Sequence, residues 1–241
     1  MDVLWLWCFL DRPAPAEAAW PFWCEVTRSR LSARRGERAE FATLLPEAGD
    51  PWIKLQETAG TCRTHLDLDV EDIPTAIAQA EALGAQVIQR TTQGYAVLAS
   101  PGGFTFCLTT WDRSASRPRL GPTLLDQVCL DIPPRAYAAE VAFWQSLLTA
   151  QVLPGRVPGF ALLAPARELP LRILLQRLDA DAPAVNAHAD LACANRSQAV
   201  AEHEALGATV VAEFPHWSVL ADPAGARYCL TDRDPLTGRL A

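Results

Sequence analysis

The chain contains a long internal repeat. The segment 65–109, HLDLDVEDIPTAIAQAEALGAQVIQRTTQGYAVLASPGGFTFCLT, recurs at 188–231 as HADLACANRSQAVAEHEALGATVVAEFPHWSVLADPAGARYCLT. The EALGA motifs begin at Glu81 and Glu204 (204 − 81 = 123), and the leading histidines, His65 and His188, are also 123 positions apart. The two copies therefore stay in register through a whole helix, which indicates duplication of a folding unit rather than a short solenoid repeat.

Each copy has the pattern of a strand, a helix and further strands. Polar and apolar residues alternate from His65 to Val70, as in a half-buried strand, and helical spacing follows over 73–83. Two short strands are expected around Val97 and Phe106. The tight turn between them is written SPGG in one copy and DPAG in the other, with proline at the position that favours its fixed φ.

The part of the chain before each copy repeats more weakly. Strands are expected at 5–10 and 127–132, each followed by a helix with an FW dipeptide, at Phe22 and Phe143. Further strand-like stretches lie at 41–45, 52–56, 160–163 and 171–176. The sequence thus predicts four βαβββ-like units in two modules, 1–112 and 124–235, joined by a linker at 113–123 that is rich in Ser, Arg, Pro and Gly.

Composition narrows the class of protein. The net charge is −7 and the pI is about 5.1, which argues against a nucleic-acid partner. No apolar run approaches the roughly 18 residues that span a bilayer, and the opening MDVLWLWCFL lacks a basic start, so we expect a cytoplasmic protein with no membrane partner. The seven cysteines include no CxxC motif, so buried thiols are expected rather than disulfides or a zinc ribbon.

Several of these segments occur together in one known superfamily. They are LQE at Leu55 and LQR at Leu175, HxD at His65 and His188, the EALGA helix ends and the final DPAGARYCL hairpin. In these the chain resembles the vicinal oxygen chelate proteins, which include glyoxalase I, bleomycin-resistance proteins and extradiol dioxygenases. It looks most like the tandem glyoxalase-like domain proteins common in actinobacteria.

The resemblance implies an α+β fold. Each of the two modules would consist of two βαβββ units that form a half-open, cup-shaped sheet, with helices on the outer face and a ligand on the concave face. The strand alternation agrees with this arrangement, because Leu66, Leu68 and Val70 would pack under a helix. His65, Asp67 and Asp69 would then point toward the cavity.

The resemblance also implies where a metal would bind. The metal-ligand positions of the superfamily correspond to Gln127, Gln176, His188 and Cys229 in module two, and to Leu6, Gln56, His65 and Cys107 in module one. Only the histidines are unambiguous ligands, and uncharged amide oxygens hold a divalent cation weakly. We therefore expect no cofactor. If a metal binds, the expected ligands are Gln127, His188 and Cys229, a set that suits zinc. An alternative strand register turns Glu57 inward in place of Gln56, and Arg177 in place of Gln176.

The expected ligand-binding residues combine these positions with their neighbours. The HxD pairs can be structural hydrogen bonds, oriented general bases or ligand-anchoring donors, and we favour ligand binding. His203 is expected on the outer, solvated side of its helix. The full set is His65, Asp67, Gln56, Cys107, Gln127, Gln176, His188, Asp190, Trp217 and Cys229, with Trp217 as an aromatic wall of the cavity.

These expectations favour a monomer or homodimer that binds a small organic molecule without a catalytic metal. Resistance, sequestration and uncharacterised catalysis are the roles considered, with an aromatic natural product as ligand, and whether the chain is an enzyme stays open. The alternative is a metal-dependent lyase, isomerase or dioxygenase that uses module two. A third reading is that one module only scaffolds the other.

Overall fold

Residues 1–92, 94–110 and 121–240 are described by a computed structural model. The expected linker at 113–123 lies outside the described residues except for its last three positions. The predicted module boundaries at 112 and 124 therefore stay a prediction.

Four βαβββ units follow one another along the chain. The first contains β1 (Val3–Pro13), α1 (Ala19–Val26), β2 (Arg30–Leu31), β3 (Phe41–Leu45) and β4 (Ile53–Thr58). The second contains β5 (Arg63–Val70), α2 (Ile73–Ala82), β6 (Gln86–Arg90), β7 (Ala96–Ala99) and β8 (Thr105–Thr110). The third contains β9 (Thr123–Ile132), α3 (Tyr137–Leu147), β10 (Ala150–Pro154), β11 (Phe160–Pro165) and β12 (Arg172–Arg177). The fourth contains β13 (Asn186–Cys193), α4 (Arg196–Ala205), β14 (Thr209–Glu213), β15 (Trp217–Ala221) and β16 (Arg227–Thr231).

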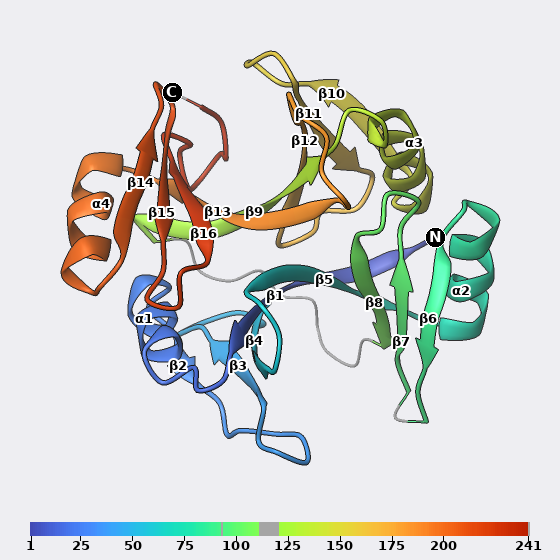
Figure 1. Cartoon of the computed structure of the whole chain (residues 1–241), viewed down its shortest axis with the longest axis horizontal. Helices are drawn as coiled ribbons and strands as arrows, with labels where there is room; N and C mark the ends of the chain where they lie inside the picture. Colours follow the sequence, from blue (N-terminus) through green and yellow to red (C-terminus); the bar gives the residue numbers. More distant parts are fainter. Residues whose placement is uncertain (93, 111–120, 241) are drawn as a thin grey trace. The chain divides into compact units, whose positions relative to one another are not determined.

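Each consecutive pair of units shares one eight-stranded sheet. The strand orders are β2-β3-β4-β1-β5-β8-β7-β6 and β10-β11-β12-β9-β13-β16-β15-β14 (Figure 1). The sheets are mixed, because β5 pairs parallel with β8 while β7 pairs antiparallel with β8. Each order runs between two different end strands, so both sheets are open in the part of the chain that is described. The α+β class and the two tandem modules, each of two βαβββ units in one open sheet, are thereby confirmed.

The strand predictions were correct where a strand is buried. In β5, Leu66 and Leu68 are fully buried and Val70 is nearly so, as the alternation predicts. The sequence did not reveal β2, β6, β10 and β14. All four are end strands of their sheets, and their residues are mostly exposed, so they carry little hydrophobic pattern. The longest described helix, α3, has 11 residues, and no described helix is long and apolar enough to cross a bilayer.

The compact units of the chain are not the two modules. One compact unit contains Met1–Cys8, His65–Ala115 and Val128–Ala187, so it combines most of the second and third βαβββ units with the start of β1. The other contains Phe9–Thr64, Ser116–Gln127 and His188–Ala241, and combines the first and the fourth. We refer to them as the first and the second compact unit.

A buried carboxylate joins the two halves of the first compact unit. Glu140 of α3 is fully buried, and its Oε2 accepts a hydrogen bond from Trp144 Nε1 at 2.8 Å. Its Oε1 accepts one from the backbone N–H of Gly102 at 2.5 Å, in the turn between β7 and β8. A Cβ at position 102 would lie 2.6 Å from Val185 Cγ2 and 2.9 Å from Glu140 Oε1, so this approach requires glycine.

The second compact unit has the same kind of junction, but here the carboxylate lies in the hairpin turn and not in the helix. Trp23 of α1 donates from Nε1 to Asp222 Oδ2 at 2.9 Å, and Arg12 Nε donates to the same oxygen at 2.6 Å. Asp222 lies in the turn between β15 and β16, and its Oδ1 accepts from the backbone N–H groups of Ala224 and Ala226, each at 3.0 Å. The hydrogen bonds from Trp23 and Arg12 thus join α1 and β1 to the last hairpin, while those from Ala224 and Ala226 close the turn itself.

His203 of α4 is buried, so the expectation that it is solvated was wrong. It is 2 % exposed, its Nδ1 lies 2.9 Å from the Tyr228 hydroxyl, and its ring packs edge-on against Phe22 at 5.7 Å. The helical pattern predicted an exposed position because the neighbouring positions of α4 are polar. The imidazole is instead buried in the core, where it packs as an aromatic ring and makes one hydrogen bond.

We predict that Glu140→Gln lowers the free energy of unfolding by about 2 to 3 kcal/mol, because one of the two N–H donors then faces an amide NH₂ group. Urea denaturation measures this change. Glu81→Gln is the matched control in the same compact unit, since Glu81 is exposed and lies 3.6 Å from Arg90. That surface pair should contribute less than about 1 kcal/mol. Equal effects of the two substitutions would show that the Glu140 junction does not stabilise the unit.

We also predict an acid-sensitive stability that depends on His203. Burial lowers the pKa of His203 from its ordinary value of 6.5 to about 4. The unfolded chain therefore binds a proton between these two values that the folded chain does not, so stability falls as the pH drops from 6.5 toward 4. The loss should reach about 3 kcal/mol. His203→Gln should flatten this part of the stability profile, whereas His216→Gln, at an exposed histidine, should leave it unchanged.

Candidate functional site

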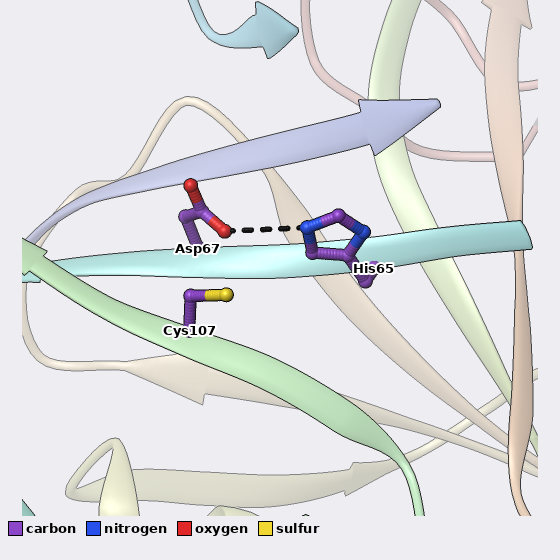
Figure 2. Close-up of side chains that lie close together, drawn as sticks. All are labelled: His65, Asp67 and Cys107. Atoms are coloured by element: carbon purple, nitrogen blue, oxygen red, sulfur yellow. Dashed lines mark ion pairs between the residues drawn. The ribbon is translucent and has the colours of Figure 1, made fainter. Parts of the chain in front are cut away.

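The polar face of β5 carries the first candidate cluster. His65 Nε2 lies 3.5 Å from Asp67 Oδ1, and Asp67 is paired in register with Cys107 of β8. Figure 2 shows the imidazole, the carboxylate and the thiol close together, and their donor atoms all lie within 4.8 Å of one another. We call His65, Asp67 and Cys107 the first polar cluster.

The thiol of this cluster is held in its protonated form. Burial, followed by the charge of Asp67, raises the pKa of Cys107 to about 11. A thiol with this pKa is neither a thiolate nor a nucleophile at neutral pH. By itself Cys107 therefore contributes a small, weakly polar surface.

Asp69 continues the polar face of β5. One of its oxygens accepts a hydrogen bond from Thr109 Oγ1, and the other accepts one from Trp7 Nε1 at 2.6 Å. Trp7 rather than Leu6 is thus the residue of β1 that faces the polar side of β5, because successive residues of a strand point to opposite faces. The assignment of Leu6 to this position was wrong by one residue.

The second candidate cluster repeats the first on β13. His188 Nε2 lies 3.3 Å from Asp190 Oδ1, and Asp190 is paired in register with Cys229 of β16. The donor atoms of these three residues also lie within 4.8 Å of one another. Gln127 of β9 donates from Nε2 to Asp190 Oδ2 at 2.6 Å. We call His188, Asp190 and Cys229 the second polar cluster.

A buried arginine makes the two clusters different. Arg233, two residues beyond β16, is 6 % exposed. Its guanidinium forms an ion pair with Asp126 through Nη2 and lies 3.7 Å from Asp190 Oδ2 through Nη1. Burial alone would raise the pKa of Asp190, but His188, Arg233 and Gln127 hold that pKa below its ordinary value. Asp190 is therefore a carboxylate whose charge is already partly neutralised.

Three predicted residues lie apart from these contacts. Gln56 of β4 is half-buried and pairs in register with Phe41, and Gln176 of β12 accepts from Cys129 Sγ at 3.7 Å. Gln56 belongs to the second compact unit, whereas the His65–Asp67 pair of its sheet belongs to the first. Gln176 belongs to the first compact unit, whereas the His188–Asp190 pair of its sheet belongs to the second. Trp217 begins β15 and stacks on Phe214 with ring centres 4.8 Å apart.

Sequence reasoning missed Asp126, Arg233 and Trp7. Asp126 had a signal, because a charged residue in the apolar run TLLDQVCL needs a buried partner. Trp7 could have been found by aligning FLDRP with CLDIP, which gives an offset of 120 (130 − 10) and pairs Trp7 with Gln127. Arg233 had no comparable signal, since it lies beyond the repeated segment.

The two clusters differ in how well they fit a divalent cation. The first offers imidazole, carboxylate and thiol within bonding reach of one ion, a donor set that suits zinc or a similar cation. In the second, such an ion would sit beside a guanidinium. A divalent cation about 5 Å from a single positive charge is repelled by roughly 7 kcal/mol at an effective dielectric constant near 20, before the opposing attraction of Asp126. The second polar cluster therefore fits a divalent cation less well than the first.

Comparison with known proteins places the chain in a family. The glyoxalase-like domain family matches it twice, at residues 7–109 and 127–231. The chain belongs to the glyoxalase-like domain family. No curated protein matches its sequence.

Solved structures share the fold of this glyoxalase-like chain at low sequence identity. A Mn(II)-bound glyoxalase from Novosphingobium aromaticivorans is 17 % identical with a TM-score of 0.65, over 95 % of this chain and 82 % of that one. The 2,2',3-trihydroxybiphenyl 1,2-dioxygenase from Sphingomonas wittichii is 14 % identical with a TM-score of 0.65, over 95 % and 90 %. An extradiol ring-cleaving dioxygenase from B. fuscum is 15 % identical with a TM-score of 0.66, over 99 % and 74 %.

These neighbours lend no support to the expectation of a protein without a cofactor. One of them is a Mn(II)-bound enzyme, and the glyoxalase-like chain itself contains side-chain groups that could hold an ion. The fold is shared, whereas the activity of each neighbour belongs to that neighbour.

We predict that Asp190→Asn lowers the free energy of unfolding by about 2 to 4 kcal/mol, because it leaves the buried Arg233 with Asp126 as its remaining anion. Thermal and urea denaturation measure the change. Asp179→Asn, at an exposed position, is the matched control and should shift stability by less than about 0.5 kcal/mol. A neutral effect of Asp190→Asn would contradict the importance of this charge cluster.

Proposed function

We propose that this glyoxalase-like protein binds a small organic molecule through its His–Asp pairs, and that the second polar cluster does so without a metal ion. The observation that carries this proposal is the repetition of the pair. Asp67 and Asp190 are 4 % and 3 % exposed, and each lies next to a histidine at nearly the same distance, 3.5 and 3.3 Å. Burying a carboxylate is costly, and both copies retain it on the face opposite the apolar residues of the strand.

The chemistry of the pair suits a ligand with hydroxyl or carbonyl groups. A histidine oriented by a carboxylate presents its ring in a fixed direction and can exchange hydrogen bonds with such groups. The neighbouring Trp7 and Gln127 each donate to a carboxylate of the same polar face, so the donors and acceptors are held in place before a ligand arrives. A hydroxylated aromatic molecule fits this description. Resistance or sequestration, a cytoplasmic location and a monomeric or dimeric state are part of the same proposal.

A second candidate function is favoured by the first polar cluster. His65, Asp67 and Cys107 could hold a divalent cation, which when bound would polarise an oxygen of the substrate. Cation binding there would require loss of the Cys107 proton, so it should weaken as the pH falls. The metal-dependent alternative would thus use the first module rather than the second.

The test measures ligand binding by EDTA-treated protein. Titration calorimetry is carried out with two probes, 2,2',3-trihydroxybiphenyl and catechol. We expect binding of at least one probe without added metal. His188→Ala should weaken it about 10- to 100-fold through loss of a polar contact, and His65→Ala should do the same if both sheets bind. His216→Ala is the matched control at an exposed histidine and should leave the affinity unchanged. Binding that appears only after Mn²⁺ is added, and that is lost in His65→Ala, would contradict the metal-free proposal and support the second candidate.

A further inference from the structure

The position of Arg233 is unusual for a positively charged group. It is almost completely buried, and its two carboxylate partners, Asp126 and Asp190, come from neighbouring strands of the sheet. Asp126 and Gln127 are adjacent in β9, so their side chains point to opposite faces of the sheet. Arg233 nevertheless contacts both Asp126 and Asp190, the carboxylate to which Gln127 donates. The guanidinium therefore lies at the edge of the second polar cluster and is held there from two sides.

The first sheet cannot hold an arginine in the same way. The offset of 120 between β1 and β9 places Leu6 at the position of Asp126, and Leu6 is 1 % exposed. A buried guanidinium there would lack one of the two anions that compensate Arg233. The repeat has thus diverged at this point, while histidine, aspartate and cysteine are kept in both clusters.

We propose that Arg233 is a tethered cation that takes the place of a divalent ion in the second polar cluster and closes it to metals. This inference rests on the proposed function, because it explains how the cluster works without a metal. The donors themselves suit a cation, since imidazole, carboxylate and thiol lie within 4.8 Å of one another. What opposes an ion is the positive charge beside Asp190 and the occupation of Asp190 Oδ2 by Gln127 and Arg233. Removing the guanidinium should therefore create a metal site.

The experiment measures binding of Co²⁺ alone by calorimetry and by its absorption spectrum, in which a cysteine ligand gives a thiolate charge-transfer band. All variants carry His65→Ala, so that the first polar cluster does not compete. Arg233→Met should bind one equivalent of Co²⁺ at least 100-fold more tightly than the parent with Arg233. The gain should be lost when His188→Ala or Cys229→Ser is added.

A second variant guards against a folding defect. Arg233→Met leaves Asp126 buried without its partner, whereas Asp126→Asn combined with Arg233→Met removes one positive and one negative charge and keeps the formal charge of the cluster unchanged. It should gain Co²⁺ binding as well, with circular dichroism unchanged. Arg239→Met, at an exposed arginine in the same compact unit, is the control and should gain nothing.

The outcomes separate this inference from the proposed function. A folded Arg233→Met or double variant that gains no Co²⁺ binding overturns the role of Arg233, while ligand binding by the EDTA-treated parent would still stand. Tight binding of Co²⁺ by the parent through His188 overturns the inference directly. A gain of binding that survives His188→Ala places the ion elsewhere and overturns it too.

Discussion

A buried carboxylate that receives an indole N–H is the contact on which each compact unit depends. Glu140 accepts from Trp144 and Gly102, and Asp222 accepts from Trp23 and Arg12. A buried charge is stable only when its hydrogen bonds are satisfied, so these contacts fix where the helix and the distant hairpin meet. Because each junction links a helix that precedes one repeated segment with the turn of the other, it binds the two modules' segments into shared compact units.

In both junctions a helix meets a distant hairpin turn, but the element that supplies the carboxylate differs. Trp23 and Trp144 are 121 positions apart, but the carboxylate comes from the turn in one case and from the helix in the other. Where α3 has Glu140, α1 has Ala19, and where one turn has Asp222, the other has Ser100. The difference between DPAG and SPGG follows, since glycine is needed only where Glu140 approaches the turn. Each substitution is therefore interpretable only together with its distant partner.

The sequence predicted the parts of the molecule that periodicity controls. Alternation in HLDLDV identified both the buried face of β5 and the polar face with His65 and Asp67, and the repeat carried the same prediction to His188 and Asp190. It could not predict which polar residues meet across strands. The contacts of Asp126, Arg233 and Trp7 depend on register and on the packing of segments far apart in the chain, which a pattern of 2.0 or 3.6 residues does not encode. His203 was misplaced for the same reason, because Tyr228 and Phe22, which make it a core residue, are remote in sequence.

Charge is where the two polar faces have diverged most. With neutral histidines, Asp67 and Asp69 give the first a formal charge of −2. In the second, Asp190 contributes −1, and the adjacent ion pair of Arg233 with Asp126 contributes no net charge. The difference originates on the other side of the sheet, because Arg233 can be buried only where β9 supplies Asp126, and β1 has Leu6 there. A residue that does not face the polar cluster thus decides its electrostatics. Since potential in a buried site acts strongly on a charged group, the two polar faces are different electrostatic environments although they share the histidine, the aspartate and the cysteine.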